Sequence, residues 1–212
     1  MAAKTRQQTL EALGNYQRQD GRDLGVEGIG QLLESESDRG IVVIFGSFIE
    51  DALRTRILLK LGQPSPAAAK NLTRNGGALS NWAQLISMAV VLGVIDEADT
   101  GLFECLKAMR NACAHSRKHI DFETPELLSV FYLMVDQNTA ERIARLSREH
   151  RRMIFVLVCS CILDRVNGQP FELAMYRMQT GLDQVLAGEP LGPLPERLPQ
   201  LSSPDGDPGQ PR

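Results

Sequence analysis

Residues 36–61 read ESDRGIVVIFGSFIEDALRTRILLKL, and the spacing of their apolar side chains predicts one long amphipathic helix. The side chains expected on its buried face are Ile41, Ile44, Phe45, Phe48, Ala52 and Leu59. Ser35 is the expected N-cap, and Gly62 the expected terminator. Gly40 and Gly46 lie inside the helix, where each costs about 1 kcal/mol relative to alanine. They therefore predict that another helix packs closely there.

The same periodicity continues through the rest of the chain. It predicts helices over residues 81–92, from 99 or 100 to 115, from 125 onward, over 138–166 and over 171–186. No stretch alternates apolar and polar residues in the way a half-buried strand does. The second half of the 138–166 helix is apolar on all sides, which favours a place at the centre of a bundle. The sequence thus predicts an all-α, up-and-down helical bundle.

Composition divides the chain into three segments. We expect a polar N-terminal segment over residues 1–22, a helical domain over 23–187 and a C-terminal tail over 188–212. Seven of the 11 prolines fall in that last segment. Such a composition cannot bury enough apolar surface to fold, so the tail is predicted to be disordered.

Charge and aromatic content limit the classes of function. The formal net charge is -3 and aromatic residues make up 5% of the chain, so neither indiscriminate nucleic-acid coating nor broad base stacking is expected. Any nucleic-acid contact must come from a local basic surface. The N-terminus lacks the apolar stretch of a signal peptide, and the apolar run 153–163 is too short to span a membrane. A cytoplasmic protein without membrane contact is the resulting prediction.

Neither a metal nor another cofactor is predicted. The four cysteines, Cys105, Cys113, Cys159 and Cys161, form no Cys-x-x-Cys pair and are expected to be buried in a reducing compartment. His115 and His119 have the spacing of a helical metal pair. Arg110, Arg117 and Lys118 would crowd a divalent cation there, and no third ligand follows.

The segment Arg110-Asn111-Ala112-Cys113-Ala114-His115 closes the predicted helix that ends at residue 115. Its histidine exchanges a proton near neutral pH, its arginine is a fixed cation, and its asparagine can orient either. Together they could cleave a phosphodiester without a metal. Asn111 and His115 lie one turn apart, with Lys107 one turn earlier, whereas Arg110 and His115 are separated by about 140°. A site therefore needs a second surface, from a neighbouring helix or a second subunit.

A purely structural role explains the same residues. Arg110 would pair with Glu50 or Asp51, and Asn111 would cap the helix. His115 would then complement the negative end of the helix dipole. Short motifs recur by accident, so this reading stays open on the residues alone.

Two patterns resemble known families. The lead-in Leu106-Lys107-Ala108-Met109-Arg110-Asn111 and the closing Ala114-His115 resemble the Arg-Asn-x-x-x-His signature of the HEPN superfamily of helical domains. In the same order as in the mannitol operon repressor (MltR) family, the chain also carries Glu36-Ser37-Asp38-Arg39-Gly40, Ser47-Phe48-Ile49-Glu50-Asp51-Ala52-Leu53, Gly77-Ala78-Leu79-Ser80 and Leu92-Gly93-Val94-Ile95. This resemblance covers roughly residues 34–116, under half of the chain. Cys113 departs from it, because a bulky aromatic residue is expected there.

The resemblance implies a fold, a partner and a reaction. It implies a HEPN-type homodimer in which two such helices face one another across a cleft. His115 would be the general base or acid, Arg110 would stabilise the phosphorane, and Asn111 would orient the histidine or the phosphate. The product would be a 2′,3′-cyclic phosphate. Glu50 and Asp51 would hold Arg110 in place.

A basic stripe is a second signal for nucleic acid. Arg142, Arg145, Arg148 and Arg152 recur at helical spacing and could track a phosphate backbone, although a solvated helix face explains them as well. Two functions follow. One is a metal-independent RNA endonuclease. The other is a non-catalytic transcriptional regulator, a repressor of a sugar-alcohol operon that binds a protein or nucleic acid. For either function, the candidate partners include RNA and a protein such as an antitoxin.

Overall fold

The computed structural model describes residues 33–189 and 195–197, and every regular element in them is helical. In chain order the elements are α3 (Asp38–Lys60), α4 (Pro66–Thr73), α5 (Trp82–Val91), η1 (Glu97–Asp99), α6 (Thr100–His115), α7 (Pro125–Tyr132), α8 (Gln137–Ala144), α9 (Arg148–Val166) and α10 (Phe171–Leu186). The all-α prediction is confirmed for this part of the chain. The predicted N-terminal segment 1–22 and most of the predicted tail 188–212 lie outside the described residues.

Helix α3 starts two residues later than its sequence predicts. Its N-cap is Ser37, not Ser35, and the Ser37 hydroxyl accepts a hydrogen bond from the Gly40 N–H at 3.0 Å. Either serine suits an N-cap, so residue type alone could not choose between them. The end is as predicted, because Gly62 follows the C-cap with a φ of 79°, a left-handed conformation that favours glycine.

The buried face of α3 is rotated relative to the prediction. Ile41 and Phe45 are buried as expected, and the line continues through Ile49, Leu53 and Ile57. The other four predicted core side chains lie at the margin or outside: Ile44, Phe48 and Ala52 are half-buried and Leu59 is 43% exposed. The buried side chains of α3 therefore recur every four residues. This regular burial arises because neighbouring helices cover α3 along nearly its whole length.

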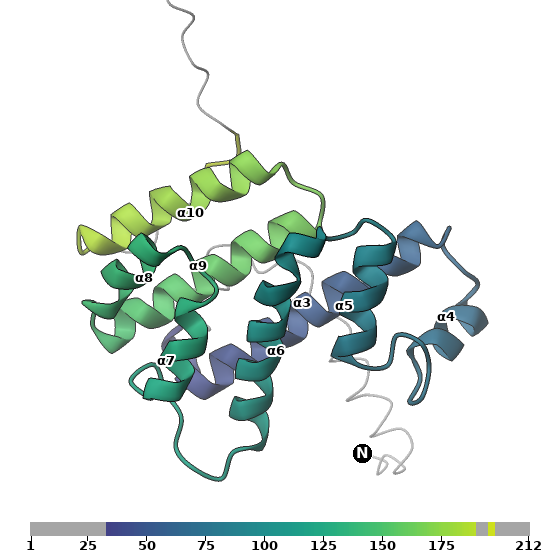
Figure 1. The fold of residues 1–212 in the computed structure, drawn as a ribbon, viewed down its shortest axis with the longest axis horizontal. Helices are drawn as coiled ribbons and strands as arrows, with labels where there is room; N and C mark the ends of the chain where they lie inside the picture. The colour runs from purple at the N-terminus through teal and green to yellow at the C-terminus, as the bar shows by residue number, and fades with distance from the viewer. Residues whose placement is uncertain (1–32, 190–194, 198–212) are drawn as a thin grey trace, which may run out of the picture.

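Helix α3 is the axis on which the other helices assemble. It packs against α9 and α6 most extensively and against α5 at its C-terminal end. Figure 1 shows α6 crossing α3 steeply, with α4 and α5 toward one end of α3 and α7 and α8 toward the other. This places the C-terminal end of α6 close to the start of α3.

The centre of the molecule is the apolar second half of α9, as predicted. Its side chains from Ile154 to Ile162 are buried, except for Ser160, and α10 covers them from the other side. Phe155 also contacts Phe122 and Phe131, with ring centroids 5.3 and 5.6 Å away. This cluster fixes the segment that follows α6 against the core.

The helix predicted over residues 138–166 is in fact two helices. α8 ends at Ala144, and α9 begins at Arg148 after a new N-cap, Ser147, which accepts from the His150 N–H. The N-cap of α8 is Asp136, two residues before the predicted start, and its carboxylate accepts from the Thr139 N–H at 3.0 Å. The break changes which basic residues share a face.

Across residues 33–189 and 195–197, none of the helices combines the length and the apolar character that a membrane span requires.

Candidate functional site

The candidate site lies on the last two turns of α6. This helix turns Phe103, Leu106, Met109 and Cys113 into the core, a stripe with helical spacing. Leu102, next to this stripe, is half-buried. Asn111 and His115 occupy the opposite side of the helix and are exposed. As predicted, these two residues lie one turn apart on the same face of the helix.

His115 is the last residue of α6 and reaches solvent. Its ring makes no hydrogen bond with any residue in the described part of the chain, and Ser116 closes the helix through its N–H to the Ala112 carbonyl oxygen. An imidazole without a fixed partner can take or give a proton to a ligand. His115 therefore has the access that acid–base chemistry requires.

Arg110 lies at the edge of α6 and leans toward α3. Its aliphatic stem crosses Gly46, where a Cβ atom would come within 2.7 Å of the Arg110 Cγ atom. The predicted close packing at Gly46 is thereby explained, since only glycine leaves room for this stem. The guanidinium emerges beyond the glycine with its side chain 28% exposed.

Two neighbours hold the guanidinium of Arg110. Nη2 lies 3.6 Å from Glu50 Oε2, and Nη1 donates to Asn111 Oδ1 at 3.4 Å. Nε is buried and has no hydrogen-bond partner among the described residues. Arg110 therefore pairs with Glu50, as the purely structural role predicts. Asn111 instead contacts Arg110 and does not cap the helix.

Of the two acidic residues expected beside Arg110, Glu50 contacts it and Asp51 does not. Asp51 pairs with Arg54 at 2.5 Å, and Arg54 also donates to Glu50 at 2.7 Å. Glu50 is thus shared by two arginines, and its side chain is only 15% exposed. Lys107, the third supporting residue, forms an ion pair with Glu104 one turn earlier on α6.

A buried carboxylate next to the site was missed by the sequence analysis. Asp38, 2% exposed, accepts from the Phe122 N–H at 3.0 Å and from Arg148 Nε at 2.8 Å, and it lies 3.4 Å from Arg152 Nη1. This joins the start of α3 to the segment after α6 and to the first turn of α9. The only available signal was its position in the first turn of a predicted helix, where an acidic residue is ordinary.

Arg39, the next residue, contacts α6 directly. Its Nη2 donates to the Ala114 carbonyl oxygen at 3.2 Å, one of the carbonyls that a helix end leaves without a partner. The same corner affects Cys113. Burial raises the pKa of its thiol to about 11, with Arg39 lowering it in part and Asp38 raising it. The Cys113 thiol is therefore protonated at neutral pH and fits its predicted role as a small apolar side chain.

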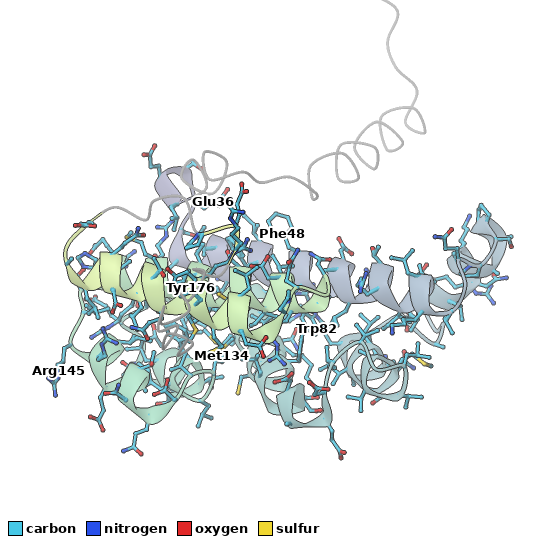
Figure 2. All side chains as sticks on the ribbon, turned by 90° about the horizontal axis from the view of Figure 1, so that it is seen from above. Glu36, Phe48, Trp82, Met134, Arg145 and Tyr176 are labelled. Atoms are coloured by element: carbon cyan, nitrogen blue, oxygen red, sulfur yellow. The ribbon has the colours of Figure 1, made fainter. Side chains whose placement is uncertain are left out.

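The predicted basic stripe is split between two places. Arg148 and Arg152 lie at Asp38, near the C-terminal end of α6. Arg142 pairs with Asp183 of α10 at 3.0 Å, and Figure 2 shows Arg145 projecting from the edge of the molecule. The structure thus gathers half of the stripe at Asp38 and leaves the other half elsewhere.

The other predicted core cysteines, Cys159 and Cys161, are buried, and Cys105 is half-buried. Within the described residues, no three His, Cys, Asp or Glu side chains gather where a metal ion could be held.

The contact of Arg110 with Gly46 predicts a stability difference between two glycine variants. Gly46→Ala should lower the free energy of unfolding by about 1–3 kcal/mol, because the added methyl group collides with the stem of Arg110 near its base. Gly101→Ala in α6, whose Cβ meets open space, should raise it by up to about 1 kcal/mol. Urea unfolding of both variants measures the difference, and equal stabilisation of both would contradict the close contact.

No protein-family model matches the chain, and neither a curated protein nor a solved structure matches it significantly.

Proposed function

We propose that the chain is a metal-independent endoribonuclease with a HEPN-type fold that acts as a homodimer through Arg110, Asn111 and His115. One observation carries this proposal. The imidazole of His115 is exposed on the solvent face of α6 with no partner among the described residues, while Glu50 pairs with the guanidinium of Arg110 at the edge of the same helix. A mobile proton and a held cation are the two components that metal-free phosphodiester cleavage requires.

A second copy of the chain completes the site. Within one protomer Arg110 leans over Gly46 toward α3, whereas His115 faces away from the core. The outward face between them carries Lys107 and Asn111. Ala108 and Ala112 lie just beyond His115 and are exposed and small enough for another helix to approach closely. Isologous pairing of this face brings two sets of the three side chains to one cleft.

The reaction needs no external reagent. His115 accepts the proton of a ribose 2′-hydroxyl, and the 2′-oxygen attacks the adjacent phosphorus. Arg110 balances the negative charge that develops on the phosphorane oxygens, with Asn111 aligning its guanidinium. The P–O bond to the 5′-oxygen breaks, and that oxygen receives a proton from a protonated histidine. The products are a 2′,3′-cyclic phosphate and a 5′-hydroxyl.

A non-catalytic regulator, related to the mannitol operon repressors, is the second candidate. It is supported by the position of two cavities in the described part of the molecule, neither of which is lined by Arg110, Asn111 or His115. One, of about 250 Å³, lies by Asp99 and Phe103, and the other, of about 420 Å³, lies along α5 by Met88. Since α6 rises 1.5 Å per residue, Asp99 is roughly 24 Å from His115. The open surface at His115 would then bind a macromolecule without transforming it.

Incubating the purified full-length chain with single-stranded RNA in EDTA tests the nuclease. We expect cleavage whose 5′ products end in a 2′,3′-cyclic phosphate, identified by mass spectrometry. An all-2′-deoxy strand of the same sequence should remain intact, because it lacks the nucleophile. Intact RNA at every protein concentration, or cleavage of the deoxy strand at the same rate, would contradict this mechanism.

A further inference from the structure

We propose that Arg39 and Arg148 form a second phosphate-binding site for the RNA, beside His115. This inference rests on the proposed function, and it names residues that the cleavage motif does not contain. The substrate is then an RNA strand long enough to place a second backbone phosphate at these arginines.

Both guanidinium groups are anchored on one side and open on the other. Arg39 is held by the Ala114 carbonyl oxygen through Nη2, and Arg148 is held by Asp38 through Nε. Their remaining N–H groups have no partner in the described part of the chain and are not among its buried unpaired atoms. An arginine fixed at one edge with free donors at the other is suited to bind a phosphate.

Among the described residues, Asp38 is the carboxylate that forms ion pairs with the arginines of this corner. Asp38 is shared by Arg148 and Arg152, and Arg39 contacts no carboxylate among the described residues. Hydrogen bonding to Asp38 and its charge raise the pKa of Arg148, with smaller contributions from Asp121 and Glu123. The Arg148 guanidinium is therefore charged at neutral pH.

The location relates this corner to the cleavage motif. Ala114, the acceptor for Arg39, immediately precedes His115 in α6. Asp38 and Arg39 are consecutive on α3, so Arg148, which pairs with Asp38, is held next to the residue that contacts this end of α6. A strand with one phosphate at His115 can therefore continue along its backbone onto these arginines.

Salt-dependent binding measures the contact. The probe is a short fluorescein-labelled single-stranded RNA, and the protein is the full-length His115→Ala variant, which would leave the RNA uncut. Each phosphate contact on a single strand contributes about 0.7 to the slope of log affinity against log salt concentration. We expect Arg39→Gln and Arg148→Gln each to weaken binding about 10-fold and to make this negative slope shallower by about 0.7.

Arg74→Gln is the matched control, because Arg74 caps α4 and the variant removes the same charge far from α6. Unchanged binding by this control, with losses in the other two, supports the site. Equal losses in all three, or none in Arg39→Gln, would overturn it while leaving the nuclease standing. Should Arg148→Gln fail to fold, Arg39→Gln decides. If the wild-type chain does not cut RNA in EDTA, the proposed function itself fails.

Discussion

A His115→Ala variant is expected to cleave single-stranded RNA about 10²–10⁴-fold more slowly than the wild-type chain, the usual contribution of a general acid or base. The loss should appear with no fall in the free energy of unfolding, because the ring is exposed and bonds to no described residue. Initial rates in EDTA and urea unfolding of the same preparations provide the two measurements.

His119→Ala is the matched control for this result. His119 lies four residues further along, is also exposed, and contacts Asp121 at 3.1 Å, so its loss should leave the rate unchanged. Equal cleavage by wild type and His115→Ala would point to a contaminating nuclease or a different site. Equal losses in both histidine variants would mean that the reaction responds to the local surface and not to one proton carrier.

Replacing Asp38 with alanine is expected to lower the free energy of unfolding by about 3 kcal/mol. The variant leaves the Phe122 N–H without its acceptor and removes the counter-charge of Arg148 and Arg152. Arg148 is 40% exposed, so water recovers part of the loss and the effect stays below the upper range for buried pairs. Thermal unfolding should show a decrease of about 10 °C in Tm.

Asp51→Ala provides the comparison, since Asp51 is 75% exposed and forms a single surface pair with Arg54. Its expected cost is at most about 0.5 kcal/mol. If both aspartate variants unfold with the same small change, the buried carboxylate does not hold the two helices and the loop together. Asp38→Asn, which retains an oxygen acceptor for Phe122, should lie between wild type and Asp38→Ala.

The helix ends could be predicted where one residue type decides them. Asn81 caps α5 through the Gln84 N–H, and Pro125 occupies the first turn of α7. α10 begins and ends where the sequence predicts, at residues 171 and 186. These signals are local, since each depends on backbone groups within one turn.

The remaining features depend on contacts that no local pattern contains. The break between α8 and α9 falls in a stretch with continuous helical spacing, and Ser147 is an N-cap that a helix interior also tolerates. The burial of Asp38 depends on Arg148, 110 residues away. In the candidate site, the shared face of Asn111 and His115 followed from helix geometry, whereas the choice of Glu50 over Asp51 required the packing of α3 on α6.

The spacing of Gly46 and Glu50 has a consequence for how this helix pair can vary. One turn of α3 provides both the gap for the hydrocarbon part of Arg110 and the acidic group at its tip. Inserting a single residue between them would rotate the Glu50 carboxylate by about 100° around the helix axis, and the Arg110 guanidinium would lose its ion-pair partner. Evolution can therefore substitute residues in this turn, but the number of residues between Gly46 and Glu50 has to stay the same.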